Sequence, residues 1–196
     1  MTTEIVLIRH GETNWNIEHR YQGTSDTPLN DLGNRQAQAL ANEIRGEQWD
    51  QVISSPLKRA WGTAVPVAEA IGVNESLLIP DPRLMERAYG VAEGLILAER
   101  EERYPGEVWE GLESRENLNH RSMTTIEEYI RRFPSQRLVM VTHGTWITSV
   151  LDVITHGEFG YGKSIILNTS RTFLTFNSHG WKVGEISLAD HLAALA

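Results

Sequence analysis

Cysteine is absent from this chain of 196 residues. Without thiols, the protein has no disulfide cross-links, no thiolate nucleophile and no cysteine-bound metal centre. Long hydrophobic runs are also missing, because no apolar segment reaches the length that spans a bilayer. The N-terminal sequence has neither the basic segment nor the apolar core of a secretory signal peptide. We therefore expect a cytoplasmic protein that does not engage a membrane.

Positively charged residues are fewer than negatively charged ones. The chain has 18 lysines and arginines against 26 aspartates and glutamates, which gives a net charge of −8. Broad binding to nucleic acid needs a basic face, so we expect no nucleic-acid partner. Only Lys58, Lys163 and Lys182 are lysines. Codon bias explains this ratio, but so does selection of arginine for oxyanion recognition, which lysine performs poorly.

The length and a hydrophobic content of 40% are sufficient for one domain with a substantial core, and we expect residues 1–196 to form a single domain. A helix is predicted to begin at Asn30 or Asp31. Further helices are predicted at 56–70, 113–133 and from residue 144 onward. Strands are predicted at 4–8, 51–55, 76–80, 137–142, 171–176 and 181–186. This alternation favours a largely parallel sheet that is covered by helices on both faces.

Two apolar strands end in the same way, in the segments "IVLIRHG" and "LVMVTHG". Because the carboxyl ends of parallel strands line a ligand crevice, His10 and His143 are predicted to lie side by side. Arg9 precedes His10, and Arg59 follows the strand at 51–55. Taken alone, Arg59 is better explained as a solvated residue in the first turns of a helix. Together, two arginines and two histidines form a basic pocket that suits a phosphoryl group.

Metal-assisted chemistry is the main rival for such a site. It requires carboxylates and histidines at ligand spacing, and the sequence contains no such cluster. A glycine-rich nucleotide loop is also missing. We therefore expect neither a metal nor a cofactor.

Four ordered segments carry a resemblance to a known family: "RHGETNWN", "SSPLKRA", "LMERAYGVAEG" and "VTHG". Over residues 4–190 the chain resembles the histidine phosphatase superfamily, in its phosphoglycerate-mutase-like branch. The resemblance implies an α/β fold, namely a three-layer α/β/α sandwich with a mixed, mainly parallel central sheet. It also implies a metal-independent enzyme.

The resemblance implies a role for each residue of the basic pocket. His10 would be the nucleophile that carries the phosphoryl group, which requires a neutral imidazole with one free nitrogen. Arg9, Arg59 and His143 would balance the charge on the transferring group. Glu86, in "LMERAYG", would be the general acid, although it is otherwise explained as an exposed loop glutamate.

The resemblance also implies further residues as substrate contacts. Glu93 has a structural role as its alternative, and Tyr89 either contacts the substrate or packs the loop. The implied substrate contacts are Thr13, Asn16, Gln22, Gly23, Tyr89 and Gly144.

The reaction is predicted to be hydrolysis of a small phosphomonoester. The cofactor-dependent mutases of this superfamily carry a lysine where this chain has Leu97, and the segment between Glu86 and His143 is short by comparison. The alternatives are a cofactor-dependent phosphoglycerate mutase and an inactive regulatory or binding member of the fold. The sequence gives no indication of an oligomeric state.

Overall fold

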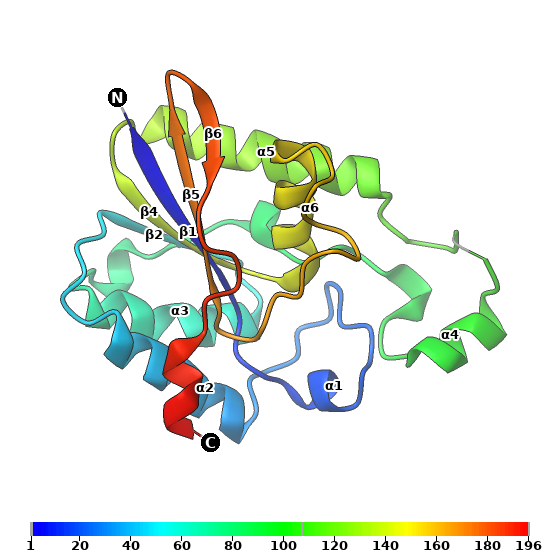
Figure 1. The fold of residues 1–196 in the computed structure, drawn as a ribbon. Coiled ribbons are helices and arrows are strands. Elements are labelled where there is room, and N and C mark those ends of the chain that lie inside the picture. The colour runs from blue at the N-terminus through cyan, green and yellow to red at the C-terminus, as the bar shows by residue number, and fades with distance from the viewer. Residues whose placement is uncertain (1, 107, 196) are drawn as a thin grey trace.

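A computed structural model describes residues 2–106 and 108–195 of the chain. Its centre is a six-stranded sheet with the order β3-β2-β4-β1-β5-β6 (Figure 1). The strands are β1 (Thr3–Arg9), β2 (Gln51–Ser54), β3 (Ile79–Pro80), β4 (Arg137–Thr142), β5 (Arg171–Asn177) and β6 (Gly180–Val183). The first four strands in the sheet order run parallel, whereas β5 and β6 are antiparallel additions at the edge. The mixed, mainly parallel sheet is confirmed.

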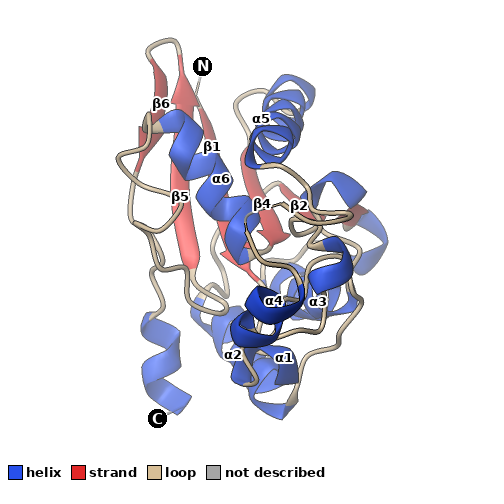
Figure 2. Cartoon of the chain, turned by 90° about the vertical axis from the view of Figure 1, so that its right-hand side faces the viewer, coloured by secondary structure: helices blue, strands red, loops and turns tan. Residues whose placement is uncertain are grey.

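Helices cover both faces of this sheet, as Figures 1 and 2 show. On one face lie α2 (Asp31–Glu43) and α3 (Lys58–Ala70), and on the other lie α5 (Arg115–Arg132) and α6 (Gly144–Ile154). Successive residues of a strand point to opposite faces, so β1 contributes to two cores. Ile5 and Leu7 pack in the cluster that contains α5 and α6 residues, and Val6 and Ile8 pack with α2 and α3. The three-layer architecture is therefore confirmed.

Two predicted strands are shorter than expected. In the predicted strand 76–80, a 3-10 helix covers Glu75–Leu77, and only Ile79 and Pro80 pair with β2. The Asn74 side chain accepts a hydrogen bond from the Ser76 backbone N–H and so begins this turn. The predicted strand 181–186 ends at Val183, although the Gly184 N–H still bonds the Phe173 carbonyl.

The segments that connect the sandwich gather beyond the carboxyl ends of the parallel strands. The short helix α1 (Asn14–Ile17) follows β1, and α4 (Leu97–Arg103) belongs to the long connection between β3 and α5 (Figure 1). Three 3-10 helices also occur outside the sandwich, at Pro82–Leu84, Gly90–Ala92 and Asp190–Leu195. Within the described residues, no helix is both long enough and apolar enough to cross a bilayer.

Candidate active site

The carboxyl ends of β1 and β4 bring the two predicted histidines together. Arg9 is in register with Thr142, so His10 and His143 are the residues that directly follow the paired ends. Their ring centroids lie 5.1 Å apart, at an interplanar angle of 58°. His10 opens onto a cavity of about 780 Å³. The residues that line this cavity include Arg9, Trp15, Asn16, Ile17, Arg20, Tyr21, Gln22, Gly23, Arg59, Glu86, Tyr89, Leu97 and Asn168.

The hydrogen bonding of His10 defines its tautomer. Its Nδ1 lies 2.7 Å from the Gly11 carbonyl oxygen. A carbonyl only accepts, so Nδ1 carries the proton and Nε2 retains its lone pair. Burial, followed by the charges of Arg59 and Arg9, lowers the pKa of His10 well below its usual value. The ring is therefore neutral at physiological pH, with one nitrogen available to attack an electrophile.

The His143 side chain is completely buried and has a single hydrogen-bond partner among the described residues. Its Nε2 lies 2.8 Å from the Ser55 hydroxyl, while Nδ1 has no hydrogen-bond partner among the described residues. Burial lowers the pKa of His143 well below its usual value, and the neighbouring Arg59, His10 and Arg9 lower it further. This ring is also neutral.

Arg9, which is half-buried, and Arg59, which is fully buried, are cations that are held by backbone carbonyls. Arg9 donates to the Ile166 carbonyl over 2.6 Å. Arg59 donates to the carbonyls of Gly23 and Ser25, over 2.7 Å in each case. In both guanidinium groups the Nε atom is buried and has no partner among the described residues. A buried donor without a partner is costly, so both groups are suited to receive an oxyanion.

A guanidinium keeps its charge at neutral pH even when it is partly removed from water. Desolvation lowers the pKa of Arg9. Burial also lowers the pKa of Arg59, to about 10, although the negative charges of Glu86, Asp26 and Glu93 act to raise it. A pKa of about 10 leaves Arg59 protonated at neutral pH.

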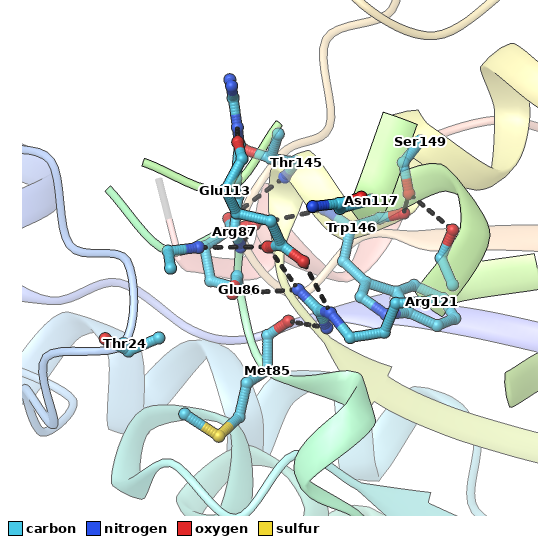
Figure 3. Close-up of polar contacts among 12 residues, drawn as sticks. Thr24, Met85, Glu86, Arg87, Glu113, Asn117, Arg121, Thr145, Trp146 and Ser149 are labelled. Carbon is cyan, nitrogen blue, oxygen red and sulfur yellow. Dashed lines mark hydrogen bonds and ion pairs between the residues drawn. The ribbon is translucent and has the colours of Figure 1, made fainter. Parts of the chain in front are cut away.

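Glu86 lies at the N-terminus of α6. Its carboxylate accepts hydrogen bonds from the backbone N–H groups of Arg87 (2.8 Å), Thr145 (3.1 Å) and Trp146 (3.2 Å), as Figure 3 shows. The side chain is mostly buried, with 8% exposure. Its carboxylate therefore lies among three backbone N–H donors, two of them in the first turn of α6.

The loop that carries Glu86 is fixed by an ion pair from α5. Arg121 forms a salt bridge of 2.8 Å with Glu113 and donates to the Met85 carbonyl over 2.8 Å (Figure 3). It also donates to the Arg83 carbonyl over 2.7 Å. The Glu113 carboxylate also accepts a hydrogen bond from the Ala88 N–H, at 3.2 Å. This network holds both sides of Glu86 in place.

The comparisons with known proteins agree with this geometry. The sequence pattern of the histidine phosphatase superfamily, branch 1, matches residues 5–188. The chain belongs to that superfamily. It is 33% identical over 194 residues to the uncharacterised phosphatase PhoE of Bacillus subtilis, with 97% of each chain covered. It is 34% identical over 206 residues to the metal-independent phosphoserine phosphatase of Arabidopsis thaliana, covering 98% of this chain and 84% of that protein.

A solved structure has the same fold. A mutant phosphoserine phosphatase from Entamoeba histolytica, in complex with phosphoserine, matches with a TM-score of 0.84 at 26% identity. The match covers 97% of this chain and 99% of that one. The histidine phosphatase fold is therefore shared over nearly the whole chain.

The remaining residues that the resemblance implied occupy different places in this histidine phosphatase. Asn16, Gln22, Gly23 and Tyr89 line the cavity. The Tyr89 hydroxyl bonds with the Thr145 hydroxyl at 2.9 Å. Gly144 lies beside Arg9 and lines a smaller adjoining hollow.

Thr13 lies apart from these residues. It is fully buried and caps α1, since its hydroxyl accepts from the Asn16 N–H. It is not among the residues that line the cavity.

Glu93 has the structural role that was considered beside the functional one. Its carboxylate accepts from the backbone N–H groups of Thr24 and Ser25, each over 2.9 Å, and from the Tyr89 N–H over 3.2 Å. It thereby ties the loop at 22–27 to the turn at 89–93. Gly23 has a φ of +54°, and a Cβ added there would come within 2.1 Å of a Glu93 oxygen. Only glycine fits this contact without rearrangement.

Several supporting residues of the superfamily site were not found from the sequence. Asn168 donates to the His10 carbonyl over 2.9 Å, and the Thr169 N–H donates to the Arg9 carbonyl over 2.9 Å. Thr169 has a φ of +56° and bonds the buried His191 at 2.8 Å. The segment "LNTSR" contains no pattern that distinguishes it from an ordinary polar loop, so these contacts depend on the fold alone.

The described residues contain no group of three or more histidine, aspartate or glutamate side chains that could hold a metal ion.

Proposed function

We propose that this histidine phosphatase is a metal-independent phosphomonoester hydrolase that works through a phosphohistidine at His10. One observation carries the proposal: a neutral imidazole with a free Nε2 stands among buried guanidinium and imidazole nitrogens that have no partners among the described residues. The relatives that are named as phosphatases support the same reaction. We also propose that the chain acts as a single domain and that it works in the cytoplasm.

In the first step, His10 Nε2 attacks phosphorus, and the bond between phosphorus and the ester oxygen breaks. Arg9, Arg59 and His143 donate hydrogen bonds to the oxygens of the transferring group, where negative charge is spread in the transition state. The Nδ1–H bond to the Gly11 carbonyl holds the ring in the attacking orientation and stabilises the positive charge that the ring acquires.

Glu86 protonates the leaving alkoxide. We infer that this proton arrives with the substrate. A phosphomonoester has a second pKa of about 6, so its monoanion carries one acidic proton. That proton passes from a phosphoryl oxygen to Glu86 and then to the leaving oxygen. In the second step, water attacks the phosphohistidine while Glu86 accepts a proton, and inorganic phosphate leaves.

The outer part of the cavity favours water over a retained sugar acid as the phosphoryl acceptor. Leu97 and Ile17 line it and are 52% and 60% exposed. Arg20 also lines it, but this guanidinium is bound by Glu18 at 2.5 Å and by the Gly94 carbonyl at 2.7 Å. A mutase must hold its intermediate tightly while it reorients. This part of the cavity has no lysine for that purpose at position 97.

The test is hydrolysis of p-nitrophenyl phosphate in the presence of EDTA. We expect the wild-type protein to release p-nitrophenol and His10→Ala to have no turnover. His179→Ala, an exposed histidine between β5 and β6, is the control and should retain full activity. A wild-type protein that binds phosphate without hydrolysing the ester, or that works only after magnesium or manganese is added, contradicts the proposal.

A further inference from the structure

Ser55 is a buried residue with no role in the proposed reaction, and it makes the only side-chain hydrogen bond that His143 has among the described residues. It follows β2, and its backbone N–H donates to the Val141 carbonyl of β4 over 2.9 Å. Both Ser55 and His143 have zero solvent exposure. The 2.8 Å bond between the Ser55 hydroxyl and His143 Nε2 is therefore made away from water, where a hydrogen bond constrains its partner strongly.

The direction of that bond decides which nitrogen of His143 carries the ring proton. Ser55 has one hydroxyl proton, and its oxygen already accepts from the Leu57 N–H over 3.4 Å. The hydroxyl proton is thus available to His143 Nε2. If Nε2 accepts, the proton of the neutral ring must be on Nδ1.

The Nδ1 atom is the one that matters for a phosphoryl group. It is buried and has no partner among the described residues, in a ring whose centroid is 5.1 Å from that of His10. An unprotonated phosphoryl oxygen only accepts hydrogen bonds. The Nδ1–H tautomer offers it a donor, whereas the opposite tautomer would offer it a lone pair and repel it.

We propose that Ser55 is a positioning residue that fixes His143 as the Nδ1–H tautomer, and so makes His143 a donor to the transferring phosphoryl group. The inference rests on the proposed phosphatase function, but it concerns a residue to which the proposed reaction assigns no role. Ser55 acts through His143 and does not touch the substrate.

The chain provides a matched control in the adjacent residue. Ser54 is also fully buried at the end of β2, and its hydroxyl donates to the Ser55 carbonyl over 2.9 Å. Ser54→Ala and Ser55→Ala each remove one buried hydroxyl from consecutive positions, but only the second removes the partner of His143.

The experiment combines kinetics with nitrogen NMR of the histidine rings, with His143→Gln used to identify the His143 signals. In the wild-type protein we expect a protonated Nδ1 and an unprotonated Nε2. In Ser55→Ala we expect the population to shift toward the Nε2–H form. We also expect a fall in kcat/KM of about 10- to 100-fold, below the 10²–10³-fold that complete loss of an oxyanion donor costs. Inhibition by orthovanadate should weaken in parallel, and Ser54→Ala should remain within about twofold of wild type in each measurement.

The outcomes separate this inference from the proposed function. An active wild-type enzyme whose Ser55→Ala variant retains the Nδ1–H signal, or loses no more activity than Ser54→Ala, overturns the role of Ser55 alone. A wild-type protein without phosphatase activity overturns the proposed function, while the ring signals still report whether Ser55 sets the tautomer.

Discussion

The imidazole rings of His10 and His143 lie 5.1 Å apart, centroid to centroid, at the ends of two adjacent parallel strands. Both rings are buried close to Arg9 and Arg59, so both have a pKa well below the usual histidine value. Two neutral imidazoles between two cations form a pocket that favours an anion over a proton. This relationship determines how the protein should respond to acid.

Stability should fall as the pH falls below about 6.5, the pKa of histidine in an unfolded chain. Below that pH the unfolded chain takes up protons that the folded His10 and His143 do not, so each contributes a loss of up to about 1.4 kcal/mol per pH unit until its folded pKa is reached. Urea denaturation at pH 7.5, 6.5 and 5.5 measures the effect. His10→Gln should reduce the slope between pH 6.5 and 5.5, and an unchanged slope in this variant contradicts the assignment of a low pKa.

Glu86→Gln should separate substrates by their leaving groups. A p-nitrophenolate leaving group needs little protonation, whereas an alkoxide needs a proton in the transition state. We expect the variant to lose about 10²-fold or more in kcat/KM with an alkyl phosphate, the usual scale of acid catalysis, and much less with p-nitrophenyl phosphate. Equal losses with both substrates would show that Glu86 is not the general acid.

Gly23→Ala should damage the site through Glu93. The new methyl group would meet a Glu93 oxygen at 2.1 Å, and the φ of +54° is unfavourable for alanine. We expect a stability loss of about 1–3 kcal/mol from the strained backbone. The loss of kcat/KM should be larger than in the control, because the Gly23 carbonyl also holds Arg59.

Gly46→Ala is the control for this variant. Gly46 has a φ of +82° and nothing within 4 Å of an added Cβ, so it measures the backbone strain alone. Thermal denaturation and steady-state kinetics of both variants give the comparison. Equal activity in the two variants contradicts the role of the loop at 22–27 in holding Arg59.

The sequence predicted the parts of the site that depend on regular structure. Two apolar segments that each end in His-Gly predict two strands with a histidine at the carboxyl end. Parallel pairing of these strands brings His10 and His143 together. Arg59 was predicted by the same argument, since it lies in the first turn of α3, just after β2. Glu86 was predicted through the family resemblance only, because its local sequence is that of an acidic loop.

The supporting contacts could not be predicted because they join segments that are distant in the chain and have no periodic pattern. Arg121 looks like one of several polar residues on a helix, yet it holds the carbonyls of Arg83 and Met85. Asn168 and Thr169 bind the backbone of β1 from a loop. The strand predicted at 76–80 failed for a local reason, since the Asn74 side chain begins a 3-10 turn there.

The phosphoryl group should be transferred to water. We expect incubation with 3-phosphoglycerate and 2,3-bisphosphoglycerate to release inorganic phosphate without faster formation of 2-phosphoglycerate. The physical reason is the outer cavity, where Leu97 and Ile17 are exposed apolar side chains and the Arg20 guanidinium is already bound by Glu18. Isomer formation much faster than phosphate release would identify a mutase.

The central claim is a covalent phosphohistidine, and the most direct test is to trap it. The wild-type protein is mixed rapidly with a radiolabelled phosphomonoester, quenched in alkali, digested and mapped. The account predicts a label that is stable in alkali and labile in acid, on the peptide that contains His10, and no label in His10→Ala. A label that is stable in acid and labile in alkali would indicate an acyl phosphate on a carboxylate, and that result would contradict the account.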